Sequence, residues 1–162
     1  MVGSARGAEG GGFDPAALSR IVPPDPVGSY ERGVVRNGIG FLSGQFPLRE
    51  GRLTHVGRVG AELTEAQGAE AAEVAALNVL AQIGTLLGGF EALDGLLRLD
   101  GFVASADGFV RQPAVLDAAS NVLLKTLGER GRHARAAFAV PRLPLDSPVE
   151  LVATFATVRT SW

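Results

Sequence analysis

The sequence has no cysteine, and it holds only two histidines, one tyrosine, one tryptophan and one methionine among 162 residues. The missing thiols exclude disulfide bonds, thiolate metal ligands and a cysteine nucleophile. The histidines, His55 and His133, lie far apart in the sequence, and neither belongs to an acidic ligand cluster. We therefore expect no zinc site and no triad of serine, histidine and acid.

Long apolar runs and excess positive charge are also missing. No run approaches the roughly 20 residues that a membrane-spanning helix requires. The net charge of −2 supplies no basic field for nucleic acid or an anionic membrane surface. The N-terminus has no apolar signal-peptide core, so we expect a cytoplasmic protein. The glycines near residues 38 and 57 lack the context of nucleotide-binding loops, and we expect no cofactor.

The composition is that of a globular protein, with 46% hydrophobic and 20% charged residues. The length fits one domain. Residues 1–26 begin glycine-rich, can start a short helix at Asp14, and end in a proline-rich stretch at 23–26. We predict a flexible N-terminal tail over 1–26 and a single domain over 27–162.

Hydrophobic periodicity predicts an α+β domain with the element order ββαβαββ. The predicted strands cover 30–36 and 39–45 around an Asn-Gly turn, then 96–105, 134–140 and 149–158. The predicted helices run from a capping box at Thr64 to Gly88, with Gln82 on the polar side, and from Gln112 to Gly128. Two helices cover only one face of such a sheet, so we expect copies of the chain to cover the other.

The last two predicted strands each carry one charge among apolar residues, namely Arg135 and Glu150. A charge inside an apolar strand is costly unless it is paired or binds a ligand. Arginine offers a planar fork of donors that matches a carboxylate at two points. We expect the two strands to be adjacent, so the two residues could form a structural ion pair, bind a ligand, or meet across a subunit boundary.

The string from Arg135 to Glu150, RAAFAVPRLPLDSPVE, resembles the closing signature of the reactive-intermediate (imine/enamine) deaminase family, also called Rid or YjgF-like. Further matching segments are GSYERG at 28–33, GIGFLSGQFP at 38–47, 56–59 and 96–105. The resemblance implies a chorismate-mutase-like fold with two helices on one face of a mixed sheet. It also implies a homotrimer whose sheets form a central barrel, with three clefts between subunits.

The resemblance assigns roles to several residues, each of which also has an ordinary structural explanation. It implies that Arg135 holds the substrate carboxylate and that Glu150 positions the attacking water. Tyr30 would close the cleft, although an early strand tyrosine is usually a packing residue. Ser43 and Gly44 would bring main-chain groups to the substrate, since a glycine inside a strand often marks a close approach.

Three further positions are assigned less directly. Phe109 walls the pocket or simply packs in the core, and Asp117 is a polar helix residue near the cleft or an ordinary exposed acid. Ala137 stands where many deaminating members carry a cysteine. This departure and the long N-terminus place the chain in a divergent subgroup. We expect Arg142, in the Arg-Leu-Pro turn, to be solvated.

The leading hypothesis is a cofactor-free hydrolase that converts reactive 2-imino acids and their enamine tautomers to 2-oxo acids and ammonia. An imine is already electrophilic, so anchoring its carboxylate and presenting a water supplies most of what is needed. The alternative is a non-catalytic trimeric module that binds a small carboxylate metabolite. A third possibility is a nuclease or translation inhibitor of the L-PSP endoribonuclease type, against which the lack of basic charge argues.

Overall fold

The computed structural model describes residue 18, residues 21–22, residue 25 and residues 28–158. The predicted tail, the short helix at 14–18 and the proline-rich stretch therefore lie largely outside the described residues. Leu18 is buried against the core of the domain.

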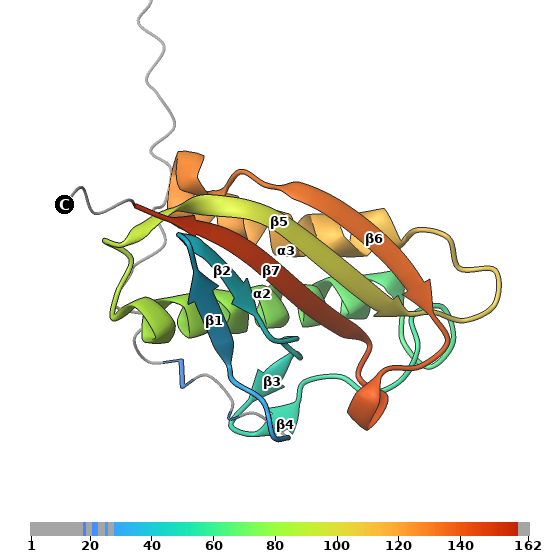
Figure 1. Ribbon diagram of the computed structural model, residues 1–162. Helices are drawn as coiled ribbons and strands as arrows, with labels where there is room; N and C mark the ends of the chain where they lie inside the picture. Colours follow the sequence, from blue (N-terminus) through green and yellow to red (C-terminus); the bar gives the residue numbers. More distant parts are fainter. Residues whose placement is uncertain (1–17, 19–20, 23–24, 26–27, 159–162) are drawn as a thin grey trace, which may run out of the picture.

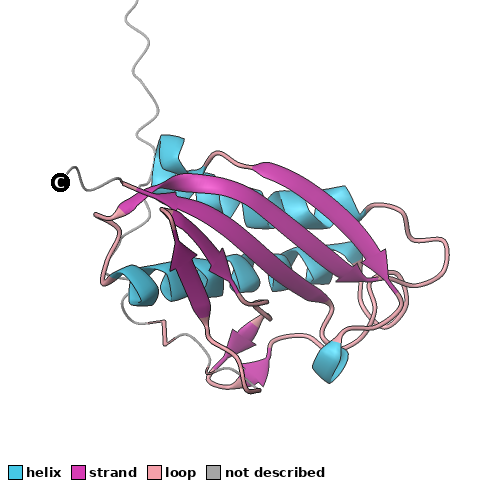
Figure 2. Cartoon of the chain, viewed as in Figure 1, coloured by secondary structure: helices cyan, strands magenta, loops and turns pink. Residues whose placement is uncertain are grey.

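A five-stranded sheet forms one layer of the domain, with the strand order β1-β2-β7-β5-β6. The strands are β1 (Gly33–Arg36), β2 (Ile39–Leu42), β5 (Leu93–Ala104), β6 (Ala134–Val140) and β7 (Val149–Thr157). Only the β5–β6 pair is parallel, so the sheet is mixed. The helices α2 (Glu65–Leu87) and α3 (Gln112–Leu127) both lie on one face of this sheet (Figures 1 and 2). The predicted order and layer arrangement are confirmed.

The element boundaries differ from the predictions at a few points. Strands β1 and β2 are shorter than predicted and leave Tyr30 and Ser43 outside the ladder, while β5 begins three residues earlier, at Leu93. A two-stranded hairpin of β3 (Leu48–Arg49) and β4 (Arg52–Leu53) is present in addition to the predicted elements.

Helix α2 is held at both ends by the predicted caps. Thr64 Oγ1 accepts a hydrogen bond from the Gln67 amide at 3.2 Å, and Gln67 Oε1 accepts one from the Thr64 amide at 2.9 Å. Gly88 ends the helix in the left-handed conformation, with φ of 69°, which glycine adopts without a steric penalty.

The prediction that Gln82 lies on the polar side of this helix is wrong, because Gln82 is buried. Helix α2 packs against α3 as well as against the sheet, so its buried surface is wider than a single apolar stripe. By length and composition α2 could also cross a membrane, but 61% of the relevant window is buried inside the domain. Such burial is what a core helix shows.

The core lies between the sheet and the helices, and the strands alternate accordingly. Along β7, Val149, Leu151, Ala153 and Phe155 are buried. The intervening residues of β7 point to the opposite face, which we call the open face because neither helix covers it. Phe41 and Phe138 on this face are 49% and 42% exposed, and the Phe138 ring stacks on Phe102 with centroids 4.9 Å apart. The described residues thus leave one face of the sheet uncovered, as predicted, with aromatic rings exposed on it.

Candidate functional site

Glu150 lies on the open face, because its neighbours Val149 and Leu151 both point into the core. Its carboxylate is half-buried and sits directly over Gly44, where a Cβ atom would overlap Glu150 Oε1. Burial raises the pKa of Glu150 above its ordinary value of 4.5, and no nearby cation acts to lower it. The described residues therefore hold an unpaired carboxylate whose proton affinity is increased.

The segment beneath Glu150 is anchored by hydrogen bonds at several points. The amide of Ser43 donates to Arg32 O at 3.0 Å, and Ser43 Oγ donates to Glu31 O at 2.6 Å. Gln45 exchanges two backbone hydrogen bonds with Leu151. Gly44 thus stays close to Glu150 although it lies outside the regular strand.

Three of the predicted site residues come together here, namely Ser43, Gly44 and Glu150. Together with Tyr30, which is linked to Ser43 only through the backbone of its neighbour Glu31, we call them the Glu150 half-site. Tyr30 directly precedes Glu31, which accepts the hydrogen bond from Ser43, and its side chain is exposed. The half-site joins the segment before β1, the segment after β2 and the start of β7.

Arg135 lies on the other face of the sheet, beside α3. Its Nη1 donates to Ser120 Oγ at 3.0 Å, and its Nη2 donates to Asp117 Oδ1 at 2.9 Å and to Pro113 O at 3.4 Å. The Arg135 side chain is 22% exposed, against 64% for Asp117. Ser120 Oγ in turn lies 3.0 Å from His133 Nε2. We call these four residues the Arg135 half-site: Arg135, Asp117, Ser120 and His133.

The prediction that Arg135 and Glu150 lie on adjacent strands is wrong, because β5 runs between β6 and β7. Arg135 is in register with Leu99 of β5, whereas Glu150 is in register with Phe102. The two residues are separated by two strand spacings across the sheet and by three residues along β5, and each of these separations is about 10 Å. They form no ion pair within one chain.

The remaining predicted residues have simpler surroundings. Phe109 packs against the core and against Gly60, which fits its structural interpretation. Ala137 is exposed on β6, opposite Gly101. Arg142 is about half-exposed, but it pairs with Asp146 and lies 4.0 Å from Glu62, so it is not simply solvated.

The two histidines have separate partners. His55 Nε2 lies 3.2 Å from Glu70 Oε2, while His133 Nε2 lies 3.0 Å from Ser120 Oγ. Over the described part of the chain, no three histidine or acidic side chains gather in a way that could hold a metal ion.

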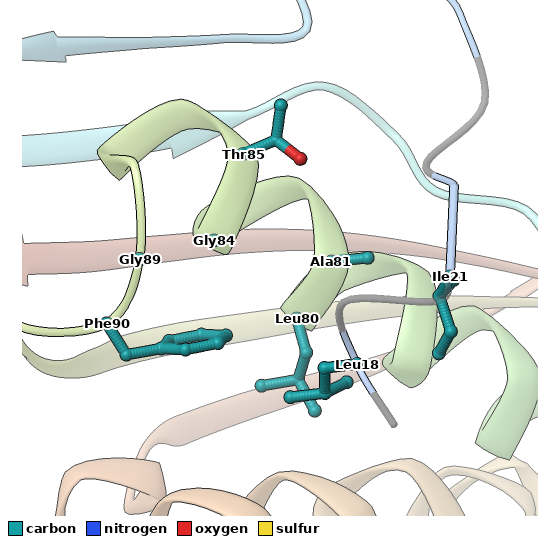
Figure 3. A pocket seen from close by; sticks show the side chains of 8 residues that line it. All are labelled: Leu18, Ile21, Leu80, Ala81, Gly84, Thr85, Gly89 and Phe90. Atoms are coloured by element: carbon teal, nitrogen blue, oxygen red, sulfur yellow. The ribbon is translucent and has the colours of Figure 1, made fainter. Parts of the chain in front are cut away.

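An apolar pocket lies away from both half-sites, on the outer side of α2 (Figure 3). Its volume is about 320 Å³. Eight residues line it: Leu18, Ile21, Leu80, Ala81, Gly84, Thr85, Gly89 and Phe90. The Thr85 hydroxyl is the one polar side-chain group in this lining, so the pocket does not suit a charged imino acid.

Ser120 and His133 are the site residues that sequence reasoning missed. The sequence did carry a signal for His133, because it stands two positions before Arg135, and residues i and i+2 of an extended segment share one face. Ser120 gave no such signal, since its contact depends on how α3 packs beside β6.

Comparisons with known proteins agree with this fold. Residues 19–158 match the family described as "YjgF/chorismate_mutase-like, putative endoribonuclease". The chain is 37% identical over 111 residues to Protein TCP17 of Trypanosoma cruzi, which covers 68% of this chain and 69% of that protein.

Two solved structures resemble the domain closely. One is the protein Atu1372 of Agrobacterium tumefaciens, a protein of unknown function, with a TM-score of 0.82 and 34% identity over 89% of this chain and 92% of that one. The other is a protein of Shewanella oneidensis MR-1 described as a putative endoribonuclease, with a TM-score of 0.81 and 29% identity over 89% and 99%.

Proposed function

Because the chain belongs to the YjgF/chorismate-mutase-like family, we propose that it hydrolyses reactive 2-imino acids, and the enamines that tautomerise to them, to 2-oxo acids and ammonia. The observation that carries this proposal is the half-buried, unpaired carboxylate of Glu150 over Gly44. A carboxylate with a raised pKa is a stronger base than an ordinary carboxylate, so it is better suited to accept a proton from water.

The reaction asks little of the protein beyond positioning. Water adds to the imine carbon while Glu150 accepts one of its protons. That proton passes to the imine nitrogen, which gives a carbinolamine with one hydroxyl and one amino group on the same carbon. The hydroxyl proton is then transferred through Glu150 to the amino nitrogen, so that the carbon–nitrogen bond breaks and ammonia leaves as the carbonyl forms. Arg135 binds the substrate carboxylate, and the Ser43–Gly44 main chain and Tyr30 border the space above Glu150.

We propose that each complete site forms between two copies of the chain. Arg135 and Glu150 are too far apart within one chain to act on a single small molecule. The uncovered sheet face, with Phe41 and Phe138 exposed, offers the surface through which copies would associate. The homotrimer implied by the family resemblance would bring the Arg135 half-site of one copy to the Glu150 half-site of the next.

Two observations favour a second candidate, a non-catalytic module that binds a small carboxylate metabolite. Asp117 already pairs with Arg135, and Ala137 replaces the cysteine found in many deaminating relatives. The net charge of −2 favours neither candidate, but it gives RNA no basic surface, so we do not propose a nuclease.

The decisive experiment measures ammonia release from an imino acid generated in the assay by a pyridoxal-phosphate enzyme. We expect wild-type protein to accelerate release above the spontaneous rate. Arg135→Ala should lower the efficiency about a hundredfold while the assembly persists, because the carboxylate loses a charged, two-point partner. Arg135→Lys should restore little, because the ammonium lacks the planar fork. A folded Arg135→Ala protein with normal turnover would refute the assignment.

A further inference from the structure

Arg135 is linked to a histidine through a serine hydroxyl. Arg135 Nη1 donates to Ser120 Oγ at 3.0 Å, and Ser120 Oγ lies 3.0 Å from His133 Nε2. The other ring nitrogen, His133 Nδ1, lies 2.7 Å from the carbonyl oxygen of Gly131. The chain of contacts joins β6, α3 and the turn that precedes β6.

The direction of each hydrogen bond follows from the chemistry of its partners. The Gly131 carbonyl only accepts, so His133 Nδ1 must carry a proton. The guanidinium only donates, so Ser120 Oγ accepts from Arg135 and directs its own hydrogen to His133 Nε2. Of the two neutral tautomers of His133, only the Nδ1–H form satisfies both the Gly131 carbonyl and the Ser120 hydroxyl.

The hydrogen bonds from Arg135 through Ser120 to His133 differ from the Arg135–Asp117 contact in their effect on a bound anion. Asp117 places a negative charge beside Arg135 and competes with a substrate carboxylate. Ser120 and His133 restrain the guanidinium without neutralising it. The Arg135 side chain is also mostly covered while that of Asp117 is largely exposed, so the contact with Ser120 is the more buried of the two.

We propose that Ser120 and His133 are positioning residues that fix the Arg135 guanidinium for recognition of the substrate carboxylate. This inference rests on the proposed function, because it assigns Arg135 the carboxylate. Restraining a long arginine side chain before binding reduces the entropy lost when the ligand arrives. The pair therefore acts on substrate affinity and leaves the water attack at Glu150 unchanged.

The test compares Ser120→Ala with Thr126→Ala. Thr126 is a matched control, because its hydroxyl lies on the same helix and donates to Val122 O of the preceding turn at 2.7 Å. Ser120→Ala should raise KM about three- to tenfold, as expected for one lost hydrogen bond, with kcat within about twofold of wild type. Ser120→Thr, which keeps the hydroxyl, should restore KM, and Thr126→Ala should leave it unchanged.

Two readouts keep the inference separate from the proposed function. Titration calorimetry with 2-oxobutanoate, a product-like 2-oxo acid, should show weaker binding to Ser120→Ala and to His133→Phe. Nitrogen-15 NMR of wild-type protein should show the Nδ1–H tautomer of His133, and Ser120→Ala should shift the Nε2 signal.

The outcomes are distinct. If wild type turns over imino acids and Ser120→Ala keeps the wild-type KM, the inference is wrong and the function stands. An Nε2–H tautomer of His133 would also overturn the inference. If wild type neither turns over imino acids nor binds 2-oxobutanoate, the proposed function fails, and the assignment of Ser120 and His133 to carboxylate recognition fails with it. Should Ser120→Ala not fold, His133→Phe decides by the same criteria.

Discussion

Arg135 and Glu150 lie on opposite faces of one sheet, with strand β5 between them. Arg135 is in register with Leu99, whose side chain is buried under the helices, and Glu150 is in register with Phe102 on the open face. Each residue has its own supporting group of side chains and backbone. One chain thus carries two half-sites that point in different directions, and this separation underlies the predictions below.

The raised pKa of Glu150 predicts how activity depends on pH. If the ionised carboxylate takes a proton from water, the rate should fall as the pH is lowered through the folded-state pKa, which lies above 4.5. Glu150→Gln should remove this limb and lower the rate about a hundredfold or more. A pH–rate profile of both proteins checks this, and an unchanged profile in Glu150→Gln would contradict the assignment.

The same group affects stability in the opposite sense. Because the folded-state pKa is raised, the contribution of Glu150 to stability is fully present below the unfolded-state pKa and is lost as the pH rises through the folded-state pKa. Glu150→Gln should therefore be at least as stable as wild type at neutral pH while being inactive. Thermal unfolding measured at pH 4 and pH 7 tests the sign of the difference.

Gly44→Ala should damage activity without unfolding the protein. A Cβ atom at this position overlaps the Glu150 carboxylate, so the side chain must move aside. Displacing a catalytic group by about 1 Å typically costs about a hundredfold in rate. Equal activity of Gly44→Ala and wild type would show that the carboxylate position is unimportant.

Asp117→Asn should strengthen binding of a carboxylate ligand. The substitution removes a negative charge 2.9 Å from the Arg135 guanidinium while keeping a hydrogen-bond acceptor of similar shape. For a pair as exposed as this one, we expect about a two- to fivefold decrease in KM. A KM that rises instead would mean that Asp117 itself contacts the substrate or is required to orient Arg135.

Phe41→Glu should separate the copies of the chain. Phe41 lies on the open face, because its neighbours Gly40 and Leu42 point into the core, so the substitution leaves the core intact. Light scattering should give a mass near three times the 16.7 kDa chain for wild type and a single chain for the variant. A wild-type monomer would remove the basis for a shared site.

Much of the fold could be predicted from the sequence because the signals are local. The capping box at Thr64, the Asn37-Gly38 turn and Gly88 each mark an element boundary through their own backbone chemistry. Gln82 was misplaced because periodicity assumes one buried helix face, whereas α2 is covered on two sides.

The site was harder to predict because it depends on pairing between distant segments. Consecutive strands are usually neighbours, which made Arg135 and Glu150 look adjacent. Here the segment after β6 returns the chain to the far side of β5. Gly44 and Glu150 were each identified, but their contact is visible only in three dimensions.

The central claim is that Arg135 of one copy and Glu150 of another form one site. Two inactive variants, Arg135→Ala and Glu150→Gln, should be unfolded together, refolded as a mixture and assayed. In any closed ring assembled at random from equal amounts, about a quarter of the interfaces combine an intact arginine with an intact glutamate. We predict recovery of about a quarter of the wild-type activity. If the mixture remains as inactive as each variant alone, although mixed assemblies form, the shared-site account is wrong.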